Sequence, residues 1–372
     1  MSNFFVIAPL SALSRRTRLF KLAKFVARKF PYVKITHIGW ERARGERVET
    51  QLQDIEIVKE ILIQGGAYGG IKTRLIYFLW MLLVFLRCLS IKKNDSVWAL
   101  GFESAFPALL ASKIRRFKVY FDDADRFSMI FSFPKPLKKI IEILERYTSR
   151  NAFIHIIPGA ERYDFESAKF HLLKNMPSET ELDQASKIYK EKTWPAASLV
   201  INVNGWLGAG RGMDAALMLA KEFPTNLAII VAGKLDCPAA EELVALPNTY
   251  YLGQVSNAEA LASYYASDLV LTYYSPTSRI NRLAESNKWG DAIKVGIGVI
   301  VNSEVETADY LRKAGIAISV PYTDHEALKK AMLVLTSDPE QQALLKKKAH
   351  HLAQTQGYFE EQLEALFAKA PL

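Results

Sequence analysis

Short apolar runs alternate with longer stretches of helical periodicity along the first half of the chain. The runs FFVIAP, VKITHIGW, DSVWALGF, FKVYFD and AFIHIIP are rich in β-branched and aromatic residues, a composition typical of strands. Stretches with helical spacing, such as residues 15–30 and 136–150, separate them. Strands that alternate with helices in this way predict a parallel, doubly wound domain.

The second half of the chain repeats this pattern. Its strand-like runs are SLVINVNG, LAIIVAGK, TYYLGQV, DLVLTYY, VGIGVIVN and AISVPY. The polar segment 176–198, with two prolines, separates the halves and is interpreted as an interdomain linker. The predicted class is α/β, with two doubly wound, Rossmann-like domains facing across a cleft. The predicted ranges are 1–185 for the first domain, 186–198 for the linker, 199–345 for the second domain and 346–372 for a helical region that packs back on the first domain.

Composition is that of a globular protein in a reducing compartment. The 372 residues are 50% hydrophobic and 23% charged, which excludes a disordered or fibrous chain. Cys88 and Cys237 lie far apart without metal-ligand spacing, so a cytoplasmic location is expected. The apolar run at the start is too short for a signal peptide and is interpreted as a first strand.

Positive charge is concentrated in the first half. Residues 1–175 hold 30 Lys and Arg against 16 Asp and Glu, a balance of +14, and the remainder has a balance of −5. This asymmetry indicates an anionic partner, either nucleic acid or anionic lipid, unless the cations are only the solvated faces of helices. The apolar run 75–86 beside basic helices such as RRTRLFKLAKFVARKF favours lipid. Twelve residues cannot span a bilayer, which requires about 20, so a buried or interfacial helix is expected.

Loops after strands of the second half carry candidate binding residues. NGWLGAGRGMDAAL contains Gly205, Gly210 and Arg211 at the start of a helix, a combination that can bind an anion. Gly233 ends the next strand. Val255 lies in a third loop, where Ser256 or Asn257 is more simply explained as a helix cap with Glu259.

The stretch AESNKWGDAIKVGIGVIVNSE places Lys288 and Asp291 on one side of a short helix before a buried strand. One interpretation is a surface ion pair of little energetic value. The other is that Lys288 binds a diphosphate and Asp291 accepts hydrogen bonds from two ribose hydroxyls. The spacing of the two residues is compatible with both.

Five motifs occur in a fixed order over about a hundred residues: RGMD, VAG, LGQV, ASDLV and SNKWGDA. In this order they resemble the donor domain of GT-B glycosyltransferases, most closely glycosyltransferase family 4. The resemblance implies that Arg211 and Lys288 contact the donor's phosphates, that Asp291 binds ribose and that Val255 lies beside the base. It also implies a nucleotide-sugar as donor substrate. No DxD motif of the metal-dependent type stands in a suitable loop, so neither a metal nor a cofactor is expected.

Two positions depart from the family pattern. Leu283 stands where the first residue of a paired-glutamate motif is expected, and Trp206 stands where many members have a second phosphate-binding Arg. These departures keep open the alternative of a catalytically degenerate scaffold in a polysaccharide assembly complex. A sugar-nucleotide epimerase on the same scaffold is disfavoured by the RGMD and NKWGDA matches.

The first half is expected to bind the acceptor. FDDAD, residues 121–125, resembles an acceptor-domain stretch of the same family more than a metal site. A retaining enzyme needs no protein base, and in an inverting enzyme Glu103 or Asp123 is the candidate; Glu103 is equally explained as a charge at a helix start. The sequence thus predicts a glycosyltransferase that uses a UDP- or GDP-sugar and a glycan or polyprenyl-diphosphate-linked acceptor in surface polysaccharide synthesis. It is expected at the inner face of the cell membrane, without nucleic acid as a partner.

Overall fold

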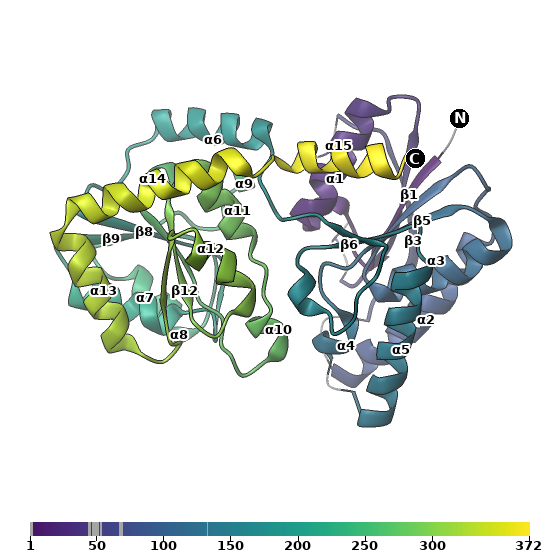
Figure 1. The fold of residues 1–372 in the computed structure, drawn as a ribbon, viewed down its shortest axis with the longest axis horizontal. Helices are drawn as coiled ribbons and strands as arrows, with labels where there is room; N and C mark the ends of the chain where they lie inside the picture. Colours follow the sequence, from purple (N-terminus) through teal and green to yellow (C-terminus); the bar gives the residue numbers. More distant parts are fainter. Residues whose placement is uncertain (1–2, 44–45, 47–51, 53, 67–69, 132) are drawn as a thin grey trace. The chain divides into compact units, whose positions relative to one another are not determined.

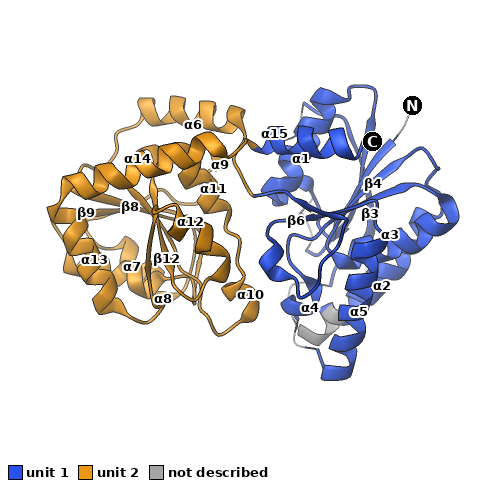
Figure 2. Cartoon of the chain, viewed as in Figure 1, with its two compact units in different colours: residues 1–174, 359–372 blue, residues 175–358 orange. Residues whose placement is uncertain are grey.

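The fold comes from a computed structural model of residues 1–372, which describes all of them except 1–2, 44–45, 47–51, 53, 67–69 and 132. Two compact units make up the chain (Figure 1, Figure 2). Unit 1 comprises Met1–Lys174 and Phe359–Leu372, and unit 2 comprises Asn175–Tyr358. Each unit contains its own parallel sheet flanked by helices. The predicted class of two doubly wound α/β domains is therefore confirmed.

Unit 1 contains a seven-stranded sheet with the order β3-β2-β1-β4-β5-β6-β7. Its strands are β1 (Asn3–Ile7), β2 (Lys34–Glu41), β3 (Ile57–Gln64), β4 (Ser96–Leu100), β5 (Lys118–Asp122), β6 (Ile154–Ile157) and β7 (Phe170–Leu172). Its helices are α1 (Thr17–Lys29), α2 (Gly70–Cys88), α3 (Phe102–Arg115), α4 (Phe127–Ile130), α5 (Lys135–Asn151) and α15 (Phe359–Lys369).

Helices cover both faces of this sheet. Successive residues of β1 point to opposite faces, so Phe4 and Val6 pack in a core with α1 and α15, whereas Phe5 and Ile7 pack in a core with α2, α3 and α5 (Figure 1). Burial on both faces explains why the strand sequences are apolar almost throughout.

Unit 2 contains a six-stranded sheet with the order β10-β9-β8-β11-β12-β13. Its strands are β8 (Leu199–Gly208), β9 (Leu227–Asp236), β10 (Thr249–Tyr251), β11 (Leu269–Thr272), β12 (Gly298–Asn302) and β13 (Ala317–Val320). Its helices are α6 (Glu179–Glu191), α7 (Met213–Glu222), α8 (Pro238–Val244), α9 (Asn257–Tyr265), α10 (Arg279–Arg282), α11 (Asn287–Val295), α12 (Asp309–Lys313), α13 (His325–Ser337) and α14 (Pro339–Thr355).

Strand order reverses between β8 and β11 in unit 2 and between β1 and β4 in unit 1. In doubly wound sheets, ligands bind outside the carboxyl ends of the strands at such a reversal. A ligand site is therefore expected at the carboxyl ends of β8 and β11 in unit 2, and at those of β1 and β4 in unit 1.

Part of the predicted linker is a helix. α6 begins with a capping box between Ser178 and Glu181, and its buried Leu182 and Ala185 pack in the same core as residues of α9. The division between the units consequently falls at Lys174, before the expected residue 185. Strands β3 and β7 were also absent from the sequence prediction. Both lie at sheet edges, and their residues are half-buried or exposed, so these segments are not the continuous apolar runs of the inner strands.

Candidate functional site

The last residues of β8 and the turn after it require glycine at several positions. Gly205, Gly210 and Gly212 have φ values of +99°, +76° and +78°, in the left-handed region that side chains disfavour. The Gly210 carbonyl accepts a hydrogen bond of 2.9 Å from the backbone N–H of Ser275, which follows β11. This bond joins the loops after β8 and β11 at the reversal of strand order.

Gly233 is enforced by contact as well as by conformation. Its φ is +136°, and a Cβ there would lie 1.8 Å from the carbonyl oxygen of Gly205, its partner in the pairing of β8 with β9. The Gly233 N–H donates a 2.8 Å bond to the Gly253 carbonyl, which joins this position to the loop that contains Val255. The Ser256–Glu259 capping box at the start of α9 is present, as the sequence indicates.

Arg211 lies between two aromatic rings. Its guanidinium carbon is 4.8 Å from the ring centre of Tyr274 and 5.4 Å from that of Trp206, distances at which a cation is attracted to an aromatic face. Trp206 is 51% exposed and donates from Nε1 to the Asp236 carboxylate at 2.5 Å. Among the described residues, Arg211 has no ion-pair partner, so its positive charge is available to a ligand.

Lys288 lies over the glycine turn. Its Cε is 3.7 Å and its Nζ 3.9 Å from the position that a Cβ on Gly205 would take. The pKa of its ammonium is lowered to about 8, first by burial and then by the Arg211 guanidinium, while Asp291 acts in the opposite direction. Within the described part of the chain it forms neither an ion pair nor a hydrogen bond. Two neighbouring cations with one carboxylate near them, that of Asp291, are compatible with the binding of an anion.

Asp291 lies one helical turn beyond Lys288 on α11, and the two are not a surface ion pair of the kind that the first interpretation required. Its charge contributes to the raised pKa of the buried Tyr264 hydroxyl, after burial itself. That hydroxyl accepts a 2.9 Å bond from Asn204, near the carboxyl end of β8. Asp291 is thus close to the same turn as Lys288.

Helices α7 and α11 both begin at this site without a side-chain cap. α7 has Gly212 as its N-cap. At α11 the Ser286 hydroxyl instead accepts a 2.8 Å bond from the Tyr274 hydroxyl. No side chain therefore caps the first N–H groups of either helix, although the Trp289 N–H of α11 donates to the Ser286 carbonyl at 3.2 Å. The dipoles of both helices add positive potential. Glycine turns, two cations and two helix starts together form an anion site with a carboxylate nearby.

Unit 1 places Glu103 and Asp123 after neighbouring strands β4 and β5. Glu103 is 7% exposed, and its Oε2 has no hydrogen-bond partner among the described residues. Its pKa is raised to about 8, chiefly by burial and further by the charge of Asp123. A pKa close to neutral pH suits general acid-base catalysis.

Asp123 is engaged through one oxygen, whereas its Oδ1 has no hydrogen-bond partner among the described residues. One of its oxygens, Oδ2, accepts a 2.7 Å bond from the Tyr163 hydroxyl and lies 3.6 Å from His155 Nε2. Its neighbour Asp122 is fully buried and bonded at 2.9 Å by Arg18 and at 3.0 Å by Trp98, so it has a structural role. In the described ranges, no group of three or more His, Cys, Asp or Glu side chains could hold a metal ion.

Several site contacts have no signal in the sequence. The roles of Tyr274 and Trp206 as ring partners of Arg211, and of Ser286 as an acceptor for Tyr274, depend on loops that meet only in the fold. The order of these residues along the sequence is compatible with many other side-chain contacts. Only the position of Tyr274 after β11, a strand at the reversal of order, could have indicated a place near the site.

Solved structures similar to the whole chain have the GT-B fold. A glycosyltransferase from Rickettsia africae is 13% identical with a TM-score of 0.69, and the match covers 99% of this chain and 97% of that one. HepE of Anabaena in complex with UDP and glucose is 13% identical, with a TM-score of 0.70 and coverage of 99% and 100%. A putative UDP-N-acetylglucosamine 2-epimerase from Listeria monocytogenes is 15% identical, with a TM-score of 0.60 and coverage of 93% and 91%.

No protein-family model matches the chain, and no curated protein matches it in sequence. At identities of 13–15% the structural likeness defines the fold, which is that of GT-B proteins.

Proposed function

We propose that this protein is a glycosyltransferase that moves a sugar from a UDP- or GDP-sugar to a glycan or lipid-linked acceptor. The observation that carries the proposal is the pair of cations, Arg211 and Lys288, at the glycine turn after β8 without a carboxylate partner among the described residues. A nucleoside diphosphate carries negative charge that would balance the two cations.

Each candidate residue has a role in this proposal. Arg211, Lys288 and the N–H groups at the starts of α7 and α11 bind the diphosphate. Asp291 accepts hydrogen bonds from the ribose hydroxyls. Gly205, Gly210 and Gly233 let the backbone approach the ligand, and Val255 lies beside the base.

The same groups would assist the reaction. As the bond between the sugar and the diphosphate breaks, negative charge develops on the leaving phosphate, and fixed cations with helix starts stabilise it. Following the resemblance to family 4, we propose retention of configuration. If the reaction inverts, Glu103 and Asp123 both remain candidates for the base, because Glu103 Oε2 and Asp123 Oδ1 have no hydrogen-bond partner among the described residues.

The acceptor is proposed from the charge of unit 1 and its apolar helix α2. A lipid-linked saccharide at an anionic membrane surface would suit both, as in the synthesis of surface polysaccharides. The similarity to HepE, whose structure contains UDP and glucose, supports the donor class. Similarity to the putative epimerase supports a second candidate, which would convert a UDP-sugar without any acceptor.

Thermal unfolding with UDP, GDP and CMP tests the proposal. A nucleotide at about 100 times its Kd stabilises by about 2.7 kcal/mol, which raises the Tm of a domain of this size by about 5–10 °C. We expect one nucleotide to give this shift, and the variants Lys288→Met and Asp291→Asn to lose it. Lys313→Met, which removes an exposed lysine paired with Asp309 at 2.7 Å, should keep it.

Equal shifts in the wild type and both site variants would contradict the proposed site, and no shift with any nucleotide would favour the scaffold alternative. If the site holds, incubation with a UDP-sugar alone separates the two enzymes. An epimerase forms a new UDP-sugar without acceptor, whereas a transferase leaves the sugar configuration unchanged.

A further inference from the structure

Helix α2 is apolar on both of its sides. The side toward the sheet buries Tyr77, Trp80, Val84 and Cys88 in the core of unit 1. The opposite side exposes a row at helical spacing, which consists of Leu75, Phe78, Leu79, Leu82 and Leu86, at 46–64% exposure. Exposed apolar residues are ordinary singly, but a continuous row indicates a surface that meets an apolar partner.

Helices α3 and α5 continue this surface. α3 packs beside α2, with Trp80 Nε1 donating to the Ser104 hydroxyl at 3.3 Å. α5 packs beside α3, and Lys113 Nζ donates to Asn151 at 3.3 Å. The exposed apolar residues on these two helices are Leu110, Ile114, Ile140, Ile143 and Tyr147. Together with the row on α2 they define the α2–α3–α5 face.

Two of the three helices of the α2–α3–α5 face are rich in positive charge. The Lys and Arg residues on or directly after α3 and α5 are Lys113, Arg115, Arg116, Lys135, Lys138, Lys139, Arg146 and Arg150. The acidic side chains of α3 and α5 are Glu103 and Glu145, which are buried, and Glu142, which lies 3.9 Å from Lys138. Outside these helices, Asp164 lies 3.6 Å from Arg146. The face therefore has a strong positive excess.

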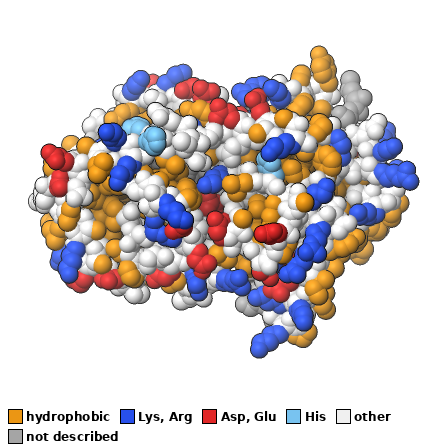
Figure 3. Space-filling view, in the orientation of Figure 1, with side chains coloured by type: hydrophobic (Ala, Val, Ile, Leu, Met, Phe, Trp, Pro, Cys, Tyr) orange, Lys and Arg blue, Asp and Glu red, His pale blue; other side chains and the backbone are white. Residues whose placement is uncertain are grey.

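The basic helix α1 does not contribute to this face, although the sequence placed it beside the apolar run. It lies on the other side of the sheet, where Phe25 stacks on Phe367 of α15 at 5.9 Å and Lys29 pairs with Glu364 at 3.0 Å. The space-filling view shows orange and blue side chains mixed over the region where α2, α3 and α5 are drawn (Figure 3). The cations that accompany the apolar helix are thus those of α3 and α5.

We propose that the α2–α3–α5 face binds the surface of an anionic bilayer. Its Leu, Ile and Phe side chains enter the boundary between headgroups and acyl chains, and its Lys and Arg side chains meet the lipid phosphates. Within the described part of the chain no helix has the length and apolarity needed to cross a bilayer, so binding is to one leaflet. The inference rests on the proposed function in one respect, since it gives the lipid-linked acceptor a place on unit 1.

A second copy of the chain fits this face less well. In a two-fold dimer the same patch meets itself, which would bring the same excess of cations together on both sides. An anionic lipid surface complements the apolar and the basic residues at once.

Vesicle sedimentation tests this inference. We expect the full chain to bind vesicles of equimolar phosphatidylcholine and phosphatidylglycerol, less at high salt, and not to bind phosphatidylcholine alone. Leu79→Gln with Leu82→Gln should weaken binding by about tenfold or more. Lys138→Gln with Lys139→Gln should weaken it by about fivefold for each charge removed. The matched control is Leu333→Gln with Val334→Gln on α13 of unit 2, which are exposed to a similar degree and should leave binding unchanged.

Several outcomes would overturn the inference: no binding by the wild type, equal binding to both kinds of vesicle, or an α13 control as weak as the α2 variant. A dimer that becomes a monomer in the α2 variant, without vesicle binding, would assign the face to a second copy. Stabilisation by nucleotide is measured on the same variants. If it persists while vesicle binding fails, the surface is wrong and the proposed donor site stands.

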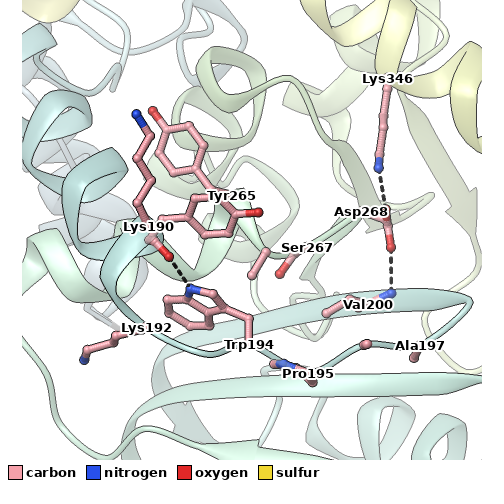
Figure 4. Close-up of a pocket in the computed structure, with 13 residues that line it drawn as sticks. Lys190, Lys192, Trp194, Pro195, Ala197, Val200, Tyr265, Ser267, Asp268 and Lys346 are labelled. Atoms are coloured by element: carbon pink, nitrogen blue, oxygen red, sulfur yellow. Dashed lines mark hydrogen bonds and ion pairs between the residues drawn. The ribbon is translucent and has the colours of Figure 1, made fainter.

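A cavity of about 540 Å³ lies at the amino ends of β8 and β11 in unit 2 and is lined by Trp194, Tyr265, Lys190 and Lys346 (Figure 4). Several of its polar groups bond to nearby residues. Lys346 pairs with Asp268 at 2.6 Å, the same carboxylate accepts from the Val200 N–H at 2.8 Å, and Trp194 donates to the Tyr189 carbonyl at 2.9 Å. This arrangement is explained by the packing of the connection into β8.

Discussion

Replacing Glu103 by Gln should stabilise the protein at high pH, because the native fold disfavours the ionised carboxyl. Glu103 is buried after β4, and its pKa is about 8 instead of the ordinary 4.5. Gln has nearly the same shape and cannot ionise. In the wild type, the native state therefore holds a proton between these two pKa values that the unfolded chain has released.

The sign and size of the effect follow from linkage. Stability is fully present below the unfolded pKa of 4.5 and falls as the pH rises through the native pKa of about 8. At about 1.4 kcal/mol for each pH unit between the two values, the loss is at most about 5 kcal/mol. Water entry and relaxation around a buried charge reduce it. We expect the variant to gain at least about 2 kcal/mol over the wild type at about pH 9 and nearly nothing at about pH 5.

Urea unfolding at the two pH values measures this difference. The fit must allow the two units to unfold separately, since a two-domain chain need not unfold in one step. Glu142→Gln on α5 is the control, because it also removes one negative charge but from a side chain 38% exposed beside Lys138. Its effect should be small at both values.

An equal difference between Glu103→Gln and the wild type at both pH values would refute the raised pKa. So would a loss of stability in the variant at high pH, which would mean that the ionised carboxylate makes a favourable contact in the native state. If the expected result is found, Glu103 is a protonated acid at neutral pH. It would then need a change in its surroundings before it could act as a base.

Two further predictions concern unit 2. Gly233→Ala should lower the free energy of unfolding by at least about 4 kcal/mol or prevent folding, because the new Cβ would meet the Gly205 carbonyl at 1.8 Å. Gly253→Ala, with φ of +78° and nothing within 4 Å of the Cβ, should cost about 1 kcal/mol. Urea unfolding compares the two variants, and similar costs would contradict the contact at Gly233. The affinity for UDP, measured by calorimetry, should fall as the pH rises through about 8, where Lys288 loses its charge. The Lys288→Met variant should not show this pH dependence. A fall of the same size in the variant would mean that another group titrates.

The fold could be predicted from the sequence because it is built from parallel strands buried on both faces. Such strands are continuous apolar runs, and the helices between them have clear periodicity. The failures are local. β7 has only three residues at a sheet edge. In α6 the apolar residues at helical spacing, Leu182, Ala185, Ile188 and Tyr189, lie among many polar ones, so the sequence of this segment indicates a linker.

The candidate site could be predicted only in part. Glycines at Gly205, Gly210 and Gly233 leave a signal in the sequence because side chains disfavour their positive φ, and at Gly233 a Cβ would also clash with the Gly205 carbonyl. The pKa of Glu103 leaves none, since burial and the nearby Asp123 depend on β4 and β5 lying side by side. The distance between side chains on different strands depends on the order of the strands in the sheet, and the spacing of residues along the sequence does not reveal that order.

The departure at Leu283 is explained by burial, since this side chain is 2% exposed and a carboxylate there would be buried as well. The departure at Trp206 has a different meaning. Its indole packs against the Arg211 guanidinium and donates from Nε1 to Asp236. Trp206 therefore orients Arg211, whereas an Arg at this position would add a second positive charge. Lys288 already provides that second charge at the same turn. The turn therefore holds two positive charges, those of Arg211 and Lys288, with Trp206 packed against one of them.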